Sequence, residues 1–406
     1  MKVLAIDDQK LVLLPLKKKL TELGYIIKVE TNAVKGLEIY DSFKPDLVIV
    51  DINMPELSGI EIIKYIRQKR NSKTPVMVLS GNVDDNMITK SFDLGINDYM
   101  KKPLSLNEVC ARIKRLIGVP KKGNYTNKVS NVIIQQRCVG VVIPCYNEEE
   151  RLLSNQFLSF INKNSGYHLC FVNDGSTDAT FDVLKSLRKG REDYITVYNC
   201  KKNGGKAEAV RLGMLHLANY NGLDYIGFLD ADLSTDLSDF DDLVSTIEKS
   251  NYKIVSGSRI TRMGANIAKE SARQIISLSI DFGIRKRLSM QFKDTQCGAK
   301  IFEKDVIQLI FKDKFITRWL FDVEIFMRMK RHFKISKVKE LICEKPLKRW
   351  VHVDGSKLSM KDSLKIILQL AKIAFVYNKN KKAMSKIDTD KLNCSISNTA
   401  FGKYNI

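Results

Sequence analysis

The sequence predicts an α/β protein built from two doubly wound domains. Residues 1–118 alternate short apolar runs with amphipathic stretches of helical period, which is typical of a parallel sheet covered by helices. A second alternation of the same kind begins at Val139, after a polar segment that contains Pro and Gly. The chain of 406 residues is too long for one typical domain, and its 44% hydrophobic content can fill two cores.

The same pattern sets the expected boundaries. We expect a first domain over residues 1–118, a linker over 119–135, a second domain over 136–378 and a disordered tail over 379–406. The linker contains Pro and Gly, and the tail is rich in Asn, Lys, Ser and Thr. Such polar segments bury too little apolar surface to fold by themselves.

Continuous apolar runs mark the buried strands. Runs of four or five apolar residues bounded by turn residues are typical of parallel strands covered on both faces. Three such runs occur in the first domain: Val3–Ile6, Leu47–Val50 and Val76–Leu79. In the second domain we expect strands at Val139–Ile143, Leu169–Asn173 and Ile226–Leu229. Helical patterns such as Leu11–Leu23 and Ile60–Lys69 lie between the strands of the first domain.

The composition limits the class of protein. The net charge is +21, and residues 1–118 hold 19 basic and 15 acidic side chains, so most of the excess lies in the second domain. This charge favours affinity for phosphate groups, anionic lipid or nucleic acid. No nucleic acid is expected, because no helix-turn-helix or other reader motif follows the first domain. Eight cysteines without a CxxC pair argue against zinc and disulfides and favour a cytoplasmic protein.

Carboxylates gather at the strand ends of the first domain. Asp7 and Asp8 follow the first strand, and Asp51 follows the third. Functional groups of an open parallel sheet meet at this edge, where three carboxylates would repel one another without a hard cation such as Mg²⁺. Ser80 and Lys102 follow later strands and could bond the oxygens of a phosphoryl group.

This ordered set resembles the receiver domain of response regulators, which has a flavodoxin-like fold. The motifs are Ile6-Asp7-Asp8, Asp51 to Pro55 with Gly59, Ser80-Gly81 and Tyr99 to Pro103. The resemblance implies Asp51 as the phosphoacceptor and a sensor histidine kinase or phosphotransfer protein as partner. It also implies roles at the pocket: Mg²⁺ held by Asp8, Asp51 and the Asn53 carbonyl, with Asp7 acting through water, a switch pair Ser80 and Tyr99, and Lys102 on the phosphoryl group.

A second constellation lies in the other domain. Asp230 and Asp232, spaced i and i+2, come just past a predicted strand. When a sugar is transferred from a diphosphate, the departing diphosphate develops negative charge, and Mg²⁺ or Mn²⁺ held by such a pair would offset it. The turn Asn203-Gly204-Gly205 precedes Lys206 and a helix start, so its backbone N–H groups and the lysine could face an anion.

Together with the runs Val141 to Glu149 and Phe171 to Asp178, these motifs resemble the family 2 glycosyltransferases of GT-A fold. The resemblance implies a nucleotide-sugar donor. It places Asp230 and Asp232 on the metal and diphosphate. It also implies the residues of the nucleotide pocket: Pro144, Tyr146, Glu148 and Asp174, with Asp178 and Lys206 close by.

Later segments look like the synthases that move glucose or mannose onto a dolichyl or polyprenyl phosphate. These segments are Val255 to Arg259, Asp294 to Lys300, Arg318 to Glu324 and Gly355 to Lys357. In that group, arginines corresponding to Arg259 and Arg273 would receive the acceptor phosphate. Ser234 stands where some relatives carry a metal-binding glutamine, so a third side-chain ligand is not expected from it.

The expected reaction is an inverting displacement at the anomeric carbon, regulated by phosphorylation of Asp51. A phosphate acceptor needs positioning and charge balance, whereas a hydroxyl acceptor needs a general base. Asp322 is the candidate base, although it could equally be a structural carboxylate, as could Asp294. The alternatives left open are transfer to a soluble or protein hydroxyl, and a non-catalytic signalling scaffold.

The basic C-terminal stretch allows two readings. Residues Leu358–Tyr377 place apolar side chains at helical spacing among lysines. They could form a helix packed on the second domain, or an interfacial helix that brings a cytoplasmic protein to the inner face of an anionic membrane.

Overall fold

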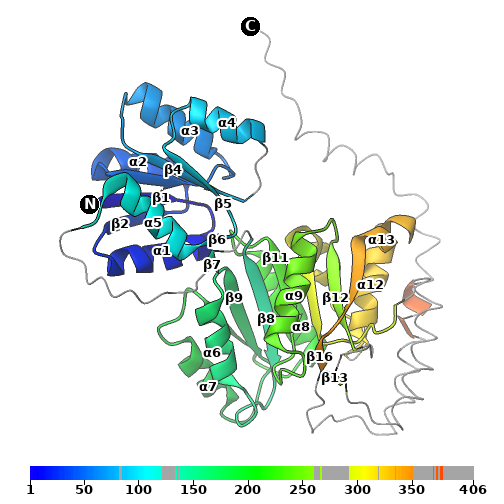
Figure 1. The fold of residues 1–406 in the computed structure, drawn as a ribbon. Helices are drawn as coiled ribbons and strands as arrows, with labels where there is room; N and C mark the ends of the chain where they lie inside the picture. Colours follow the sequence, from blue (N-terminus) through cyan, green and yellow to red (C-terminus); the bar gives the residue numbers. More distant parts are fainter. Residues whose placement is uncertain are drawn as a thin grey trace.

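The computed structural model describes two α/β domains (Figure 1). The described residues are 1–81, 85–120, 133–134, 137–259, 266–267, 292–318, 320–333, 335–350, 369, 372–373 and 375–377. Arg273, the expected tail and most of the expected linker lie outside these residues.

The first domain is built on a five-stranded parallel sheet of order β2-β1-β3-β4-β5. Its strands are β1 Lys2–Ile6, β2 Ile26–Glu30, β3 Leu47–Val50, β4 Val76–Ser80 and β5 Asp98–Lys101. The strand order reverses between β1 and β3, and a crevice opens at such a switch point beyond the carboxyl ends. The loops that carry Asp7, Asp8 and Asp51 leave the sheet at this point.

Helices cover both faces of this sheet because its strands alternate their side chains between two cores. Val3 and Ala5 of β1 enter the core with α1 and α5, whereas Leu4 and Ile6 enter the core with α2 and α3. The helices are α1 Lys10–Glu22, α2 Ala33–Phe43, α3 Gly59–Lys64 continued by the π-helical turn η1 Tyr65–Lys69, α4 Asp85–Asp93 and α5 Leu106–Ile117. Both helices predicted from the sequence of this domain are confirmed.

The second domain contains a seven-stranded sheet of order β10-β9-β8-β11-β14-β12-β15. The strands are β8 Val139–Cys145, β9 Tyr167–Asn173, β10 Ile195–Asn199, β11 Tyr225–Leu229, β12 Ile254–Ser258, β14 Ala299–Glu303 and β15 Ile342–Pro346. All pairs are parallel except those of β14, which runs antiparallel to β11 and β12. This reversal pairs Ala299, where β14 begins, with Leu229, where β11 ends. The loop before β14 therefore lies at the same edge of the sheet as the carboxyl end of β11.

Helices pack on both faces of the second sheet. One face carries α6 Ser154–Lys163, α7 Thr180–Arg188 and α9 Leu237–Glu248, and the other carries α8 Lys206–Ala218, α11 Ile307–Phe311 and α12 Phe321–His332. The short α13 Ile335–Leu341 leads into β15. The predicted fold class, two α/β domains of doubly wound type, is therefore confirmed, with β14 as the reversed strand.

Two pairs of short strands lie outside the main sheets, one antiparallel and the other parallel. β6 Leu104–Ser105 pairs antiparallel with β7 Ile133–Ile134, which falls within the expected linker. β13 Asn266–Ile267 pairs parallel with β16 Arg349–Trp350. The end of the expected linker is thus joined to the first domain.

The described part of the C-terminal stretch packs on the second domain. Ile373 is only 1% exposed, and Arg328 Nε of α12 donates to the Tyr377 hydroxyl at 3.2 Å. Phe375 on the same helical stretch is 65% exposed. Within the described residues, helices fall short of the length and apolar character needed to cross a membrane.

Candidate functional site

Asp7, Asp8 and Asp51 form a compact carboxylate cluster in the first domain. Each offers an oxygen, and these oxygens all lie within 4.8 Å of one another. Lys102, which follows β5, reaches into the cluster, with its Nζ 2.7 Å from Asp7 Oδ2 and 3.4 Å from Asp51 Oδ2. The sheet edge therefore brings together four side chains that are up to 95 positions apart in the chain.

The cluster holds more negative charge than its lysine can balance. Burial, and then the charges of Asp7 and Asp51, raise the pKa of Asp8 to about 7. Burial also raises the pKa of Asp51 to about 6, against the opposing effect of Lys102. Asp51 Oδ1 is buried without a hydrogen-bond partner among the described residues. An orphaned acceptor beside two further carboxylates fits a hard divalent cation.

The other predicted residues of this pocket surround Asp51. Ser80 is fully buried at the end of β4, and Tyr99 lies on the neighbouring strand β5. Burial and the nearby charge of Asp51 raise the pKa of Tyr99. Asn53 follows Asp51 by two residues, and its backbone donates a hydrogen bond that lowers the pKa of the Asp51 carboxyl.

A close backbone approach holds the Asp51 loop. A Cβ added to Gly59 would lie 2.1 Å from the Asp51 carbonyl oxygen, so only glycine fits where α3 begins. The amide of Gly59 donates to the Ile52 carbonyl at 3.0 Å. The loop that carries Asp51 is thus held in place by its packing against the start of α3.

In the second domain, the loops after β8 and β9 are tied together. Glu148 N donates to Thr180 Oγ1 at 2.8 Å, and Thr177 N donates to Asn147 Oδ1 at 2.9 Å. Glu148 Oε2 is buried without a partner among the described residues, and burial raises the pKa of this carboxyl. Tyr146 beside it is 37% exposed. Pro144 lies within β8, so these three predicted residues occur on one strand and its loop.

Asp174 has a structural role that was not predicted from the sequence. Its two oxygens accept hydrogen bonds from Gly204 N and Gly205 N, both at 2.8 Å. The expectation that these backbone N–H groups face an external anion is therefore wrong in this structure, because an internal carboxylate already occupies them. Asp174 shapes the glycine turn, and Lys206 begins α8 directly behind it.

Asp178 also has structural contacts. Its Oδ1 accepts from the backbone N of Thr180 at 3.0 Å, and its Oδ2 accepts from Glu149 N at 3.3 Å. The carboxylate thus satisfies amides at the start of α7 and joins the two loops. It lies beside Glu148, as expected, and within the described residues it hydrogen-bonds Glu149 and Thr180 of the protein's own loops.

Asp230 and Asp232 lie at the end of β11. Lys206 Nζ is 2.5 Å from Asp230 Oδ1, so the predicted lysine does face the predicted carboxylate. Asp232 Oδ1 accepts from Ser234 N at 2.9 Å and from the Ser234 hydroxyl. Ser234 therefore orients Asp232. Two such carboxylates suit a divalent cation that takes further oxygens from a diphosphate.

The loop before β14 closes over Asp230. A Cβ on Gly298 would lie 1.9 Å from Asp230 Oδ2, so the backbone of this loop touches the carboxylate directly. Any larger residue at this position would displace Asp230 from its place beside Lys206.

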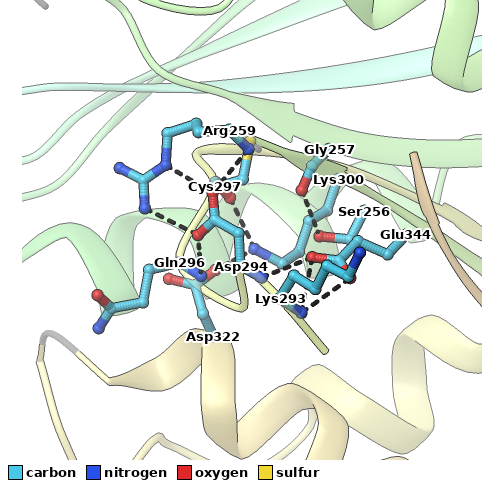
Figure 2. A network of polar contacts seen from close by, with 10 residues as sticks. All are labelled: Ser256, Gly257, Arg259, Lys293, Asp294, Gln296, Cys297, Lys300, Asp322 and Glu344. Atoms are coloured by element: carbon cyan, nitrogen blue, oxygen red, sulfur yellow. Dashed lines mark hydrogen bonds and ion pairs between the residues drawn. The ribbon is translucent and has the colours of Figure 1, made fainter. Parts of the chain in front are cut away.

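Arg259 and Asp294 form a bidentate pair next to this loop (Figure 2). Arg259 Nε lies 2.7 Å from Asp294 Oδ2, and Nη2 lies 2.8 Å from Oδ1. Asp294 N donates to Glu344 Oε1 at 2.6 Å, which fixes the loop from the other side. Burial would lower the pKa of Arg259, but Asp294 and, more weakly, Asp230 raise it above its usual value. The guanidinium is thus charged, preorganised and close to Asp230.

Asp322 lies beneath the site on α12 and is bound to a buried lysine (Figure 2). Lys300 Nζ is 2.6 Å from Asp322 Oδ1 and 2.7 Å from the Cys297 carbonyl, and its side chain is 0% exposed. Burial raises the pKa of Asp322, while Lys300 and Lys206 oppose the rise. The structural reading of Asp322 gains support, because its oxygen is already engaged by a cation.

Three residues at the site were not singled out from the sequence. Lys300 and Gly298 belong to the segment Asp294 to Lys300, which was noted in the sequence. No local sequence pattern shows, however, that Lys300 is buried or that Gly298 contacts a carboxylate. The exposed Arg318 packs its side chain against Gly205, and its charge lowers the pKa of Asp174 against the effect of burial. Trp319 and Arg273 lie outside the described residues.

Two family models match the chain. The model for the response regulator receiver domain matches residues 3–114, and the model for glycosyl transferase family 2 matches residues 140–311. The first match covers the carboxylate pocket, and the second covers the site from β8 to α11.

Curated relatives cover the same two parts. The dolichyl-phosphate beta-glucosyltransferase of Dictyostelium discoideum is 31% identical over 267 residues, which are 62% of this chain and 76% of that protein. The dolichyl-phosphate beta-glucosyltransferase of Saccharomyces cerevisiae is 30% identical over 276 residues, covering 60% of this chain and 78% of that protein. The response regulator MprA of Mycobacterium leprae is 30% identical over 130 residues, covering 32% of this chain and 57% of that protein.

The carboxylate pocket, the Asp230–Asp232 site and these matches agree on both halves of the molecule. The chain belongs to the family 2 glycosyltransferases, as an enzyme whose transferase domain follows a response-regulator receiver domain.

Proposed function

We propose that this enzyme transfers a hexose, with inversion, from a UDP- or GDP-linked sugar to a polyprenyl phosphate, under control of phosphorylation at Asp51. The names of the relatives support a lipid-phosphate acceptor and a glucosyl group. The observation that carries the proposal is the Arg259 guanidinium, which Asp294 holds in a bidentate pair near Asp230.

On the donor side, Glu148 and Tyr146 line the nucleoside part of the site, and Asp174 shapes the glycine turn next to them. Lys206 directly follows that turn, the exposed Arg318 packs against its Gly205, and both supply positive charge for the diphosphate. A Mg²⁺ or Mn²⁺ ion held by Asp230 and Asp232 would supply further charge to the leaving group. Loading would require Lys206 to share Asp230 with the metal.

On the acceptor side, the carboxylates favour a phosphate over a hydroxyl. A hydroxyl acceptor needs a base within hydrogen-bond reach, but Asp322 is paired with Lys300, and Asp294 is paired with Arg259. A phosphate is already anionic and requires only a charged, fixed partner, which Arg259 provides. Arg273 is a second proposed contact for the phosphate, on the resemblance alone.

The test is a transfer assay with the full-length protein. Radiolabelled UDP-glucose and GDP-mannose are each offered with a polyprenyl phosphate, and the products are partitioned between organic and aqueous phases. We expect label in the organic phase, and its loss in Asp232→Asn. Label on protein or soluble sugar would instead support the hydroxyl acceptor, and no turnover of any nucleotide sugar would support the scaffold.

Regulation and placement complete the proposal. The receiver pocket binds Mg²⁺ and accepts a phosphoryl group from a histidine kinase or phosphotransfer protein at Asp51. The basic transferase domain lies peripherally on an anionic cytoplasmic membrane surface, where its lipid substrate is found. If Asp51→Asn and the unchanged protein respond identically to acetyl phosphate in activity and in vesicle binding, this regulation is wrong.

A further inference from the structure

A turn of the receiver domain lies against the transferase domain. This turn, Asp8-Gln9-Lys10, joins β1 to α1 and includes a proposed metal ligand. Gln9 Nε2 donates to Asp224 Oδ2 at 2.7 Å, across 215 positions of the sequence. Lys10 Nζ is 2.8 Å from Asp193 Oδ1 at the rim of the same contact.

The two backbones approach closely at this turn. Gly222 has φ +76°, and a Cβ added to it would lie 3.0 Å from the Asp8 carbonyl oxygen and 3.2 Å from Gln9 Cα. Gln9 is 8% exposed, Leu223 is 6% exposed and Cys138 is 0% exposed. The two backbones therefore pack directly against each other at this turn, and a side chain at position 222 would strain the backbone and crowd Asp8 and Gln9.

Hydrogen bonds run without a break from the phosphorylation pocket to the transferase domain. Lys102 Nζ donates to Asp7 Oδ2 at 2.7 Å, and Gln9 N donates to Asp7 Oδ1 at 2.9 Å. The Gln9 side chain then bonds Asp224 Oδ2, which also accepts from Cys138 N at 2.8 Å. Gln9 is thus bound to the pocket through its backbone and to the transferase through its side chain.

Asp224 and Cys138 stand where two strands of the transferase begin. Asp224 directly precedes β11, which ends just before Asp230, and Cys138 directly precedes β8, which contains Pro144. The two buried strands β8 and β11 therefore connect the turn directly to the donor site.

We propose that the Asp8–Lys10 turn is the docking contact that links Mg²⁺ binding in the receiver pocket to the transferase domain. This inference deepens the regulation proposed above and specifies its structural route. Three carboxylates and one lysine leave the pocket negative, and the charge of Asp224 acts on Asp8 across the Gln9 contact. Arg137 Nη1 lies 3.5 Å from Asp224 Oδ1. Mg²⁺ would remove this repulsion, so it should tighten docking, and by linkage docking should raise the affinity for Mg²⁺.

The first experiment measures Mg²⁺ binding by calorimetry. It uses the full-length chain carrying Asp230→Asn and Asp232→Asn, which silence the transferase metal site. Adding Gln9→Ala removes the interdomain hydrogen bond but keeps the backbone amide on Asp7, and we expect the Kd for Mg²⁺ to rise about fivefold or more. The matched control Gln68→Ala changes an exposed glutamine on the far side of the receiver and should leave Kd unchanged.

The second experiment follows amide hydrogen exchange in the same parent protein. Mg²⁺ should increase protection at the starts of β8 and β11, and Asp8→Asn should abolish the increase. Equal Kd values for Gln9→Ala and Gln68→Ala, or exchange in β8 and β11 that does not respond to Mg²⁺, would overturn the inference. Neither readout uses glycosyl transfer, so a failed transferase assay and a failed linkage are separate results.

Discussion

The receiver pocket and the transferase site both have carboxylates at strand ends, but they differ in how far neighbouring groups balance the negative charge. In the receiver, Asp8 and Asp51 have raised pKa values because burial and mutual repulsion exceed what Lys102 offsets. In the transferase, five carboxylates of the site have a close partner: Asp174 the Gly204 and Gly205 amides, Asp230 Lys206, Asp232 Ser234, Asp294 Arg259 and Asp322 Lys300. The exception is Glu148, whose Oε2 is buried without a partner among the described residues.

This difference separates a switch from a preorganised catalyst. A pocket with unbalanced charge responds to a cation or a phosphoryl group, because either one changes its electrostatic energy greatly. A site with balanced charges holds its geometry before substrate arrives, which is what transition-state stabilisation requires. The comparison yields three predictions, from the largest effect to the smallest.

The largest effect is expected on the stability of the fold, when the buried ion pair Lys300–Asp322 is broken. Lys300→Met leaves the Asp322 carboxylate buried without its cation, and we expect a loss of about 3–5 kcal/mol in the free energy of unfolding. Urea unfolding of the full-length chain measures it. Adding Asp322→Leu to the same protein should recover much of the loss, since both charges are then gone. A double variant no more stable than Lys300→Met would mean that the cost lies in packing, not charge.

Removing the charge of Asp230 should affect catalysis and spare the fold. Asp230→Asn keeps the shape beside Gly298, but we expect turnover of the sugar donor to fall about 10²–10³-fold, the usual loss for one preorganised electrostatic group. The matched control is Asp182→Asn, an exposed carboxylate paired with Lys185. Activity in Asp230→Asn within a few-fold of this control would remove Asp230 from the reaction.

The receiver should show a pH dependence that Mg²⁺ suppresses. The pKa values of Asp8 and Asp51, about 7 and about 6, lie above the ordinary value of 3.8. At a pH between the ordinary and the raised values, the folded receiver therefore binds more protons than the unfolded chain. Without metal, its stability should therefore fall as pH rises from about 4 to 7.

Thermal unfolding in EDTA at pH 5 and pH 7.5 checks this sign. We expect the lower Tm at pH 7.5 for the receiver transition, and Mg²⁺ should restore it. Asp51→Asn should reduce the difference because one of the two titrating groups is gone. A Tm that rises with pH in EDTA would show that the carboxylates are compensated in a way the pocket geometry does not reveal.

The sequence predicted the site residues that follow strands better than it predicted their partners. Asp7, Asp8 and Asp51 could be placed together because parallel strands end at a common edge, and the structure confirms that placement. Asp174 bonds glycine amides 30 and 31 positions away, and Gln9 bonds a residue 215 positions away. No local pattern encodes such contacts.

Strand direction was equally invisible in the sequence. The residues of β14, Ala-Lys-Ile-Phe-Glu, would look the same whether the strand ran with or against its neighbours, so the reversal of β14 could not be anticipated. That reversal decides which loop meets Asp230. Lys300 shows the same limit, since a lysine within a strand is expected at the surface unless a distant carboxylate such as Asp322 receives it.

The pairing of β7 with β6 changes how the two domains are tethered. Because Ile133–Ile134 is fastened to the receiver, only residues 135–138 separate it from β8 of the transferase domain. Four residues span at most about 14 Å when fully extended. A tether this short holds the two domains at an effective concentration on the order of millimolar or above, so the strength of docking at Gln9 would not change when the protein is diluted.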